Sequence, residues 1–425
     1  MKQIYNRHRI ADEVYFTSIT DKKFKVNSIT VNFITEMTHN AAENAVLDRM
    51  LTKCCEKYDT MAKLNRRLSE LYSAGLNYSV ISYDDYQVCS LSANVLDNRY
   101  ALEGEDILRE TADILLGCIF APYLENGAFP EQSLDIEKQN QIDDNDSEIN
   151  DKTRYAHFKA LETGFTGEPA ALRWGGTNEE VGAVTAKTAM NAYRRMISET
   201  RAEIICVGES SFDGLDKVFA DAFSKLERRV KPLPESKISP LKNEVARVNE
   251  NLDIEQSKLV MLYKTELRKP YPLIVMKGLY GGTESSKLFL NVREKMSLCY
   301  YCYAGLLYGK GTVNVECGVA PENIGKTEKE CANQLGEIVK GNFTDEELEF
   351  AKLYIINSYR SMNDTVSGIG GKCLTSILTP ELDVDVEERV RGIAAVTREE
   401  IIEAAASLKL DTVFTLMPGE KEADE

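Results

Sequence analysis

Histidine is scarce in this chain of 425 residues, which contains only His8, His39 and His157. No two of them lie three or four positions apart, so no helix can present two imidazoles on one face. Helical zinc motifs depend on such a pair. The sequence therefore predicts no zinc centre built on a helical histidine pair.

Long apolar runs are also missing. Nowhere do eighteen apolar residues follow one another, and the N-terminal MKQIYNRHRIADEVYF lacks the apolar segment of a secretory signal. We therefore expect a cytoplasmic protein with no membrane partner.

Basic residues are fewer than acidic ones, 51 against 68, which gives a formal net charge of −17. This balance argues against a polyanion such as nucleic acid as a partner. It is compatible with binding a peptide, above all a basic one.

The ten cysteines show no framework spacing and lie mostly in apolar runs, which predicts reduced, buried thiols. One pair, Cys299 and Cys302, has C-x-x-C spacing. It lies in an aromatic strand pattern rather than at a turn or a helix start, so we expect the two side chains on opposite faces of a strand, serving packing.

The chain repeats itself. Residues 184–209 and 396–420 both begin Val-Thr and both predict a threonine-capped helix, a strand and a Gly-Glu ending. In the second copy Thr397 and Glu400 have the spacing of a capping box. Residues 64–80 and 288–304 form another parallel pair, which indicates a duplication of about 200 residues per half and thus two homologous domains.

These patterns predict an α+β fold with one N-terminal domain at 1–226 and one C-terminal domain at 251–425. Residues 227–250, rich in proline and charge, are predicted to be the linker. Each half is expected to form a mainly antiparallel sheet with helices packed on one face. Strands are expected, among other places, at 29–37, 86–96 and 311–319.

The run from Leu288 to Tyr303, LFLNVREKMSLCYYCY, predicts a helix that leads into a strand. We expect the helix to place Leu288, Leu290 and Val292 near a core. In the strand, Tyr301 and Tyr303 should alternate with Cys302.

Arg293 and Tyr300 fall around the turn between these two elements. Both side chains can donate hydrogen bonds without losing a proton first, so they suit a peptide carbonyl or a developing oxyanion. The alternative is structural, with Arg293 in a salt bridge that packs the helix and Tyr300 in the core.

Arg293, Glu294, Leu298 and Tyr300 form the pattern R-E-x-x-x-L-x-Y. It resembles the C-terminal-half signature of the pitrilysin/insulinase family of zinc peptidases. The resemblance extends over nearly the whole chain in length, two-half organisation and order of elements. It implies two halves arranged as a clamshell around a chamber, in which this pattern lines the substrate site.

The family's zinc motif, H-x-x-E-H, is lost. In the helix that should carry it, the three positions hold Ala45, Asp48 and Arg49. Alanine offers no lone pair, and a permanently protonated guanidinium repels a dication. Asp48 would have no metal-bound water to activate. We expect no metal in this chain, and His39, just before the helix, is expected to be a surface residue.

Relatives take a third, acidic zinc ligand from a later helix, which corresponds to residues 134–151 here. Four residues are candidates for that position, and we expect the cluster to be a solvated face: Glu137, Asp143, Asp144 and Glu148.

Family members of this size commonly work as pairs in which one chain carries the zinc helix and its partner the Arg/Tyr element. The resemblance therefore implies a non-catalytic, peptide-binding subunit of a heteromeric zinc-dependent peptidase. Arg293 and Tyr300 would complete the site of an H-x-x-E-H paralogue, so this chain would be active only with that zinc-bearing partner.

Two alternatives stay open. The first is a scaffold or interaction protein that keeps the peptidase fold without any proteolytic role, as core subunits of some respiratory assemblies do. The second is a self-sufficient zinc peptidase with an atypical site.

Overall fold

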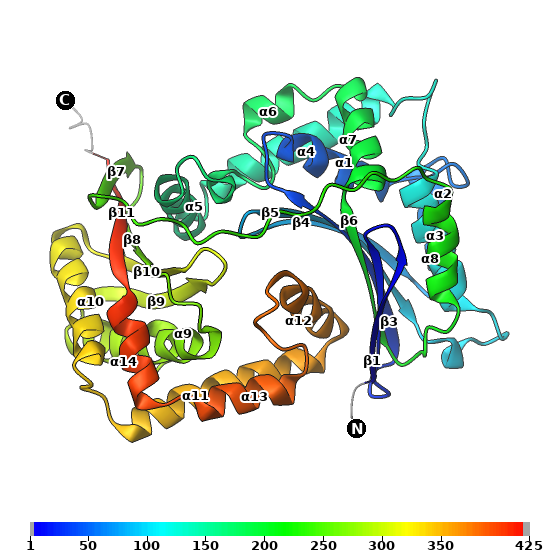
Figure 1. Ribbon diagram of the computed structural model, residues 1–425. Helices are drawn as coiled ribbons and strands as arrows, with labels where there is room; N and C mark the ends of the chain where they lie inside the picture. The colour runs from blue at the N-terminus through cyan, green and yellow to red at the C-terminus, as the bar shows by residue number, and fades with distance from the viewer. Residues whose placement is uncertain (1–3, 420–425) are drawn as a thin grey trace, which may run out of the picture. The chain divides into compact units, whose positions relative to one another are not determined.

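The computed structural model describes residues 4–419, which form two compact units built from separate segments of the chain (Figure 1). Unit 1 comprises residues up to 146, 172–235 and 362–375, and unit 2 comprises 147–171, 236–361 and 376 onward. Each unit contains one mainly antiparallel sheet. The predicted α+β class is thereby confirmed.

The sheet of unit 1 has the strand order β1-β2-β6-β3-β5-β4. All neighbouring strands pair antiparallel except β2 and β6, which pair parallel. The strands are β1 (Ile4–Ala11), β2 (Val14–Thr20), β3 (Val26–Glu36), β4 (Gly75–Tyr83), β5 (Tyr86–Leu96) and β6 (Arg201–Gly208).

One core of unit 1 joins one face of this sheet to the surrounding helices. In this core α3 packs on β5, and α1 packs on β4, β5 and α7. The helices of the unit are α1 (Ala41–Leu51), α2 (Met61–Glu70), η1 (Asn98–Tyr100), α3 (Ile107–Phe120), α4 (Glu131–Glu148), α6 (Asn178–Gly182), α7 (Ala186–Glu199), α8 (Leu215–Ser224), η6 (Met362–Asp364) and α12 (Val366–Leu378), of which α4 and α12 extend a few residues past the unit's boundary.

The sheet of unit 2 has the order β7-β11-β8-β10-β9, so β9 is an edge strand. Its strands are β7 (Ala246–Leu252), β8 (Ser257–Lys264), β9 (Cys299–Leu307), β10 (Thr312–Val319) and β11 (Lys409–Pro418). The helices are α5 (Lys152–Gly164), η2 (Pro169–Ala171), α9 (Pro270–Lys277), η3 (Gly278–Gly282), η4 (Leu288–Lys295), η5 (Pro321–Asn323), α10 (Ile324–Val339), α11 (Asp345–Ser361), α13 (Val386–Ala395) and α14 (Arg398–Ser407), where η3 and η4 are π-helical.

The two sheets repeat the same plan. The order β2-β6-β3-β5-β4 in unit 1 matches β7-β11-β8-β10-β9 in unit 2 strand for strand. In each series the first pair is parallel and the others are antiparallel. The duplication inferred from the sequence is therefore visible in the pairing of the strands.

The predicted helix starts agree with the structure. Thr397 and Glu400 form a capping box at α14, and Thr185 caps α7 at the matching place of the first half. Because each cap satisfies backbone N–H groups at the helix start, it fixes where the helix begins. In both halves the next strand follows almost at once, as β6 and β11.

Unit 2 has a helix on each face of its sheet. The core on one face contains Leu259 and Met261 of β8, whereas Val260 and Leu262 point to the other face and pack against α5. Every residue of β8 is accordingly buried. A strand covered on both faces loses the alternation of polar and apolar residues.

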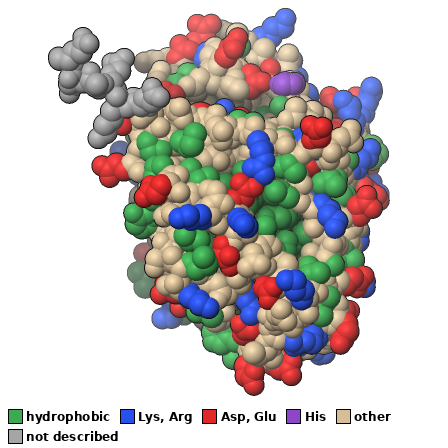
Figure 2. All heavy atoms as spheres, turned by 90° about the vertical axis from the view of Figure 1, so that its left-hand side faces the viewer, with side chains coloured by type: hydrophobic (Ala, Val, Ile, Leu, Met, Phe, Trp, Pro, Cys, Tyr) green, Lys and Arg blue, Asp and Glu red, His purple; other side chains and the backbone are tan. Residues whose placement is uncertain are grey.

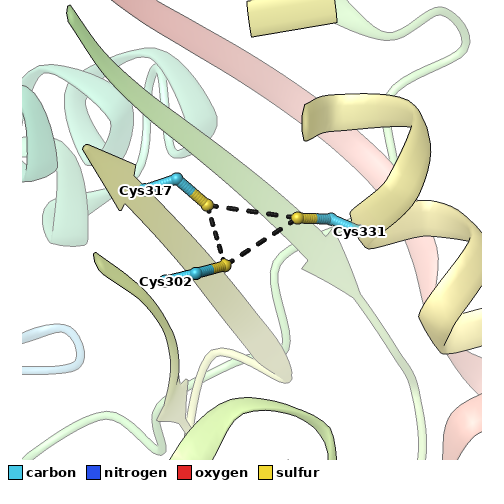
Figure 3. Close-up of side chains that lie close together, drawn as sticks. All are labelled: Cys302, Cys317 and Cys331. Atoms are coloured by element: carbon cyan, nitrogen blue, oxygen red, sulfur yellow. Dashed lines mark hydrogen bonds between the residues drawn. The ribbon is translucent and has the colours of Figure 1, made fainter. Parts of the chain in front are cut away.

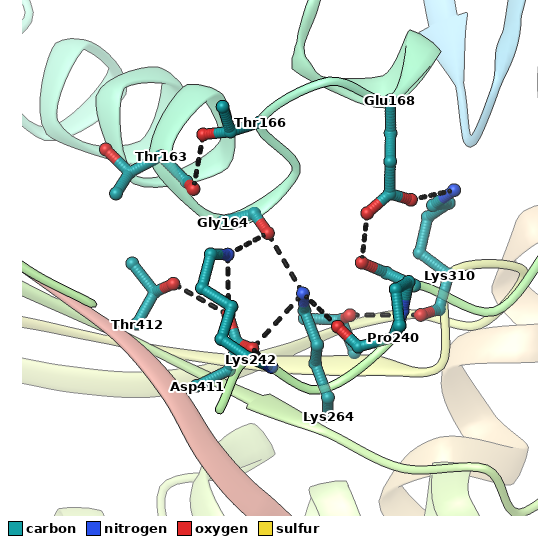
Figure 4. A network of polar contacts seen from close by, with 12 residues as sticks. Thr163, Gly164, Thr166, Glu168, Pro240, Lys242, Lys264, Lys310, Asp411 and Thr412 are labelled. Atoms are coloured by element: carbon teal, nitrogen blue, oxygen red, sulfur yellow. Dashed lines mark hydrogen bonds and ion pairs between the residues drawn. The ribbon is translucent and has the colours of Figure 1, made fainter. Parts of the chain in front are cut away.

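Buried ion pairs attach the end of α5 to this sheet (Figure 4). Lys264, only 3% exposed, donates to the carbonyls of Gly164 and Pro240, both at 2.9 Å, and its Nζ lies 3.3 Å from Oδ1 of Asp411. Lys310 pairs with Glu168 at 2.8 Å. These contacts explain why residues 147–171 belong to unit 2 although they precede the second half of the sequence.

Helix α12 is the opposite case. It comes from the second half of the chain, yet its first ten residues belong to unit 1. Gly370 lies beside Val207 of β6, and the thiol of Cys373 is hydrogen-bonded to Tyr5 of β1.

Residues 227–245 form neither helix nor strand, and β7 begins at Ala246, inside the segment 227–250 that the sequence indicated as a linker.

One sequence expectation about η4 is wrong. Leu288 and Val292 are fully buried, but Leu290 is 41% exposed. Residues two positions apart lie on opposite sides of a helix, whereas residues four apart share a face.

Within residues 4–419, no helix is long and apolar enough to span a bilayer. On the face of the molecule in Figure 2, acidic and basic side chains are interspersed. The excess of acidic side chains therefore does not form one continuous acidic patch on that face.

Candidate functional site

Helix α1 holds the three residues that the sequence resemblance predicts at the positions of the family's zinc motif. Ala45, Asp48 and Arg49 stand at i, i+3 and i+4, so they share one helical face. All three are buried, with residue exposures of 1%, 0% and 7%. The spacing is that of a helical metal motif, but these side chains are not zinc ligands of that motif.

Arg49 extends from α1 to α4, the helix in which the third ligand was expected. Its Nε donates to Oε1 of Gln141 at 3.1 Å, and its guanidinium forms an ion pair with Asp144. The same guanidinium lies over the ring of Tyr78 on β4, 5.1 Å from the ring centroid. A side-chain cation therefore cross-links the elements that surround this site.

A second cation acts beside the first. Nζ of Lys53, two residues beyond the end of α1, lies 3.3 Å from Oε1 of Glu137, whose side chain is 7% exposed. Burial of Glu137 differs from the expected solvated face, whereas Asp143 and Asp144 are exposed. Glu137 is tolerated in the interior because its charge is paired.

Asp48 is the least solvated acid of the site. Neither of its oxygens has a hydrogen-bond partner of normal geometry among the described residues. Burial raises the pKa of Asp48 well above its ordinary range, and the backbone of Ser79 and the charge of Arg49 offset only part of that rise. A carboxyl group can take a proton from water only in its ionised form, which burial disfavours here.

Zinc does not fit this donor set. Ala45 has no ligand atom, and Arg49 places a permanent positive charge on the face where the second imidazole would stand. The buried Asp48 would have to ionise before it could bind a cation. The site is held together by ion pairs of its own side chains instead.

A pocket of ≈ 1000 Å³ adjoins these ion pairs within unit 1. Lys53 and Glu137 form part of its wall, together with Met50 of α1 and Asn140 of α4. The neighbourhood of the altered zinc helix is thus hollowed rather than filled.

The three histidines lie apart and each faces an acid. His39, with a side-chain exposure of 83%, is paired with Glu180 at 3.1 Å, so its expected surface position is confirmed. His157 of α5 is bonded at 2.6 Å to Glu316, a buried residue of β10.

The Arg/Tyr element lies in unit 2, and the predicted helix-to-strand junction is confirmed, with η4 leading into β9. Arg293 stands on η4, its side chain 40% exposed, 4.7 Å above the ring of Phe289. Its ion pair is with the adjacent Glu294 at 3.6 Å. An exposed pair of this kind contributes little to stability.

Tyr300 stands where β9 departs from regular pairing with β10. Tyr301 pairs with Gly318, but the next partner of β10, Val319, pairs with Cys299, so Tyr300 is the extra residue of a β-bulge. Its exposure is 65%. A bulge redirects the side chain of the extra residue, and here it turns a phenol outward on an edge strand.

The bulge also overturns one expectation about C-x-x-C. Cys299 and Cys302 do not lie on opposite faces, because the extra residue between them shifts the alternation, and both are buried in the same core. The charge of Arg293 acts on the thiol of Cys299, the residue before Tyr300. Arg293 and Tyr300 are thus both found at the start of β9.

Sequence reasoning missed the polar group on the other face of β9. Tyr303 donates to Glu316 at 2.5 Å, and Tyr301 is hydrogen-bonded to Thr153 of α5 at 3.1 Å. The signal was present as the alternation of the tyrosines with Cys302. Only the packing of α5 on this sheet shows what the tyrosines contact.

Comparison with known proteins points to the M16 peptidases. Residues 183–354 match the family described as the peptidase M16 inactive domain. A probable inactive metalloprotease of Bacillus subtilis, YmfF, is 26% identical over 403 residues, which are 94% of each chain. The crystal structure of a conserved protein from Enterococcus faecalis covers 98% of this chain and 99% of its own, with a TM-score of 0.91 and 26% identity. The chain is thus similar to M16 peptidase-like proteins over nearly its whole length.

The M16 peptidase-like fold extends over both units. A crystal structure of a peptidase M16 inactive domain from Pseudomonas fluorescens covers 98% of each chain at a TM-score of 0.79, with 16% identity, a level that supports the fold alone. The resemblance to pitrilysin/insulinase peptidases is confirmed, and the matched family and YmfF are both described as inactive, in agreement with the side chains on α1 of this chain.

Proposed function

We propose that this chain is the non-catalytic, peptide-binding subunit of a heteromeric zinc-dependent peptidase. In this proposal Arg293 and Tyr300 complete the site of a partner that carries H-x-x-E-H. The observation that carries the proposal is the presentation of Tyr300. A tyrosine serving only the core would be buried, whereas a bulge exposes this one.

Arg293 supports the same reading. A structural arginine is usually paired with an acid on another element, as Arg49 is with Asp144. Among residues 4–419, Arg293 is paired with its neighbour Glu294 and lies over the ring of Phe289. Its forked donors therefore stay available to a peptide carbonyl.

The strand itself offers a mode of binding. β9 is an edge strand, so it has backbone N–H and C=O groups that β10 does not pair. An extended peptide can add to such an edge, with main-chain hydrogen bonds providing affinity. Arg293 and Tyr300, at the start of β9, would then hold carbonyl oxygens of the added peptide in register.

The division of labour follows from the chemistry of unit 1. With Ala45 and the cationic Arg49 on α1, and with burial disfavouring the ionised form of Asp48, this helix offers no catalytic zinc site, so water activation would have to come from the partner. The partner's metal would polarise the scissile carbonyl.

The test begins with a native pull-down that isolates any co-purifying H-x-x-E-H protein. Peptide cleavage is then measured for each chain alone and for the pair. We expect turnover only with the pair. Arg293→Ala and Tyr300→Phe should each lower kcat/KM of the pair by at least tenfold without weakening its assembly.

Two matched variants serve as controls, Arg391→Ala and Tyr354→Phe. Arg391 is exposed and pairs with an acid of its own helix, and Tyr354 is 48% exposed on α11. If the Arg293 and Tyr300 variants cleave as fast as these controls, the chain is a scaffold that lends no side chain to proteolysis.

A further inference from the structure

Three thiols from different elements meet inside unit 2 (Figure 3). Cys302 of β9 and Cys317 of β10 are direct partners across the two strands, and Cys331 reaches them from α10. The Sγ–Sγ distances are 2.9 Å for Cys302–Cys317, 3.9 Å for Cys302–Cys331 and 4.0 Å for Cys317–Cys331. None of the three is engaged in a disulfide.

A fourth thiol joins this group because of the bulge at Tyr300. Cys299 is 8% exposed and lies in the same core as the other three. We call Cys299, Cys302, Cys317 and Cys331 the thiol cluster.

The distances fit a metal ion. A triangle with sides of 2.9, 3.9 and 4.0 Å has a centre about 2.1 Å from each corner, so a point slightly above its plane is ~2.3 Å from all three sulfurs, the usual Zn–S distance. Side-chain rotation in the Cys302–Cys317 pair then brings the spacing closer to that of a tetrahedral site.

The donors are of a single, soft type. Thiolates select Zn²⁺ and Cu⁺ among the metal ions of cells. The residues of the cluster are from 0% to 8% exposed, so the site is closed to solvent, as structural metal sites are. Nearby, Tyr280 donates to the backbone carbonyl of Cys331 at 2.9 Å and so attaches α10 to η3.

Thiols bind such an ion as thiolates, so their protons are released when the ion binds. Affinity for the ion should accordingly increase with pH.

We propose that the thiol cluster is a closed structural site for a soft d¹⁰ cation, Zn²⁺ or Cu⁺, bound by Cys302, Cys317 and Cys331 and completed by Cys299. This site is separate from the altered zinc helix, which lies in unit 1. It joins the edge strand β9 to β10 and α10.

The position of the cluster gives the ion a structural consequence. Helix α10 also bonds the segment before β9, through Thr327 to the carbonyl of Leu298 at 3.5 Å, and holds Asn291 of η4 through Gln334 at 2.8 Å. A bound cation would therefore fix the bulge that presents Tyr300. This consequence rests on the proposed function, whereas the metal site itself does not.

The test uses the full chain, purified under reducing conditions and loaded separately with Zn²⁺ and with Cu⁺ before desalting. Mass spectrometry of the elements then gives the metal content per chain. We expect close to one equivalent of one of the two ions. Co²⁺ substitution should add a thiolate-to-metal charge-transfer band.

Cys331→Ala and Cys317→Ser should reduce the metal content at least tenfold. Cys206→Ser is the matched control, because Cys206 is fully buried on β6 of unit 1, and it should leave the content unchanged. If the cluster variants do not fold, Cys299→Ser replaces them, since it removes only the completing ligand and should weaken binding about tenfold.

Two outcomes overturn the proposal. One is less than a tenth of an equivalent of either ion in the folded wild-type chain. The other is a Cys302–Cys317 disulfide in the protein as isolated without reductant, with no metal taken up after reduction, which would make the cluster a redox pair. Neither outcome affects the peptide-cleavage test of Arg293 and Tyr300.

Discussion

The burial of the Asp48 carboxyl group predicts how the free energy of unfolding depends on pH. Asp48→Asn replaces it with a side chain of the same shape that does not titrate. In the unfolded chain the carboxyl ionises near its ordinary pKa of ~3.9. In the folded chain burial raises the pKa of Asp48 well above that value. Folding therefore takes up one proton in the pH range between the two pKa values.

The sign and size follow from proton linkage. For an acid with a raised pKa in the fold, the contribution to stability is fully present below the unfolded pKa and is lost as pH rises towards the folded one. The slope is about 1.4 kcal/mol per pH unit while the folded carboxyl stays protonated. For each pH unit within that range the wild type should therefore lose about 1.4 kcal/mol relative to Asp48→Asn.

Urea unfolding at pH 5, 6 and 7 measures this difference. Trp174 is the chain's one tryptophan and belongs to unit 1, where its carbonyl accepts a hydrogen bond from Gln87, so its fluorescence reports on the unit that contains Asp48. Asp135→Asn, an exposed position on α4, is the control and should give a curve parallel to the wild type. If the Asp48→Asn curve is parallel as well, Asp48 is ionised in the fold and our account of the altered site is wrong.

Three further outcomes are expected. Arg49→Met should lower the free energy of unfolding by only about 1–2 kcal/mol in urea titrations, because its partner Asp144 is 62% exposed and returns to water; a loss above 4 kcal/mol would contradict this. Asp411→Asn should cost roughly 3 kcal/mol, since it leaves Lys264 buried without its carboxylate. Burial raises the pKa of Asp411, but the hydrogen bonds from Lys242 and Thr412 and the charge of Lys264 together outweigh it and lower the pKa. The contribution of Asp411 should therefore be present above the unfolded pKa and disappear as pH falls through the folded one, so acid unfolding of wild type and variant should converge. Tyr300→Phe should change thermal stability by less than the equivalent of ~0.5 kcal/mol, as its side chain is exposed, and a larger drop in Tm would indicate a packing role.

Local signals in the sequence were sufficient for much of the fold. The threonine of each Val-Thr pair starts a helix because its hydroxyl caps backbone N–H groups, and this effect acts within one turn. The strand at 86–96 was recognisable from its composition, and its bounds agree with β5. That Ala45 and Arg49 cannot bind zinc could also be inferred from the sequence alone, because it depends only on the chemistry of these two side chains.

Long-range packing decided what the sequence left open. The sequence placed four acids near the altered helix, and only the approach of α4 to α1 showed that Arg49 reaches Asp144 while Glu137 pairs with Lys53. No local pattern marks which acid lies within reach of which cation, because the residues are more than eighty positions apart.

The sequence by itself determined the residue types at the site, the repeat of about 200 residues and the starts of several helices, because these depend on side-chain chemistry and on neighbours along the chain. The tertiary structure alone decided that a bulge exposes Tyr300 and brings Cys299 to the same face as Cys302. It alone assembled the thiol cluster and placed α5 on the second sheet. The physical reason is that strand register and helix docking minimise the exposed apolar surface of a whole unit, and this depends on contacts between residues far apart in the chain.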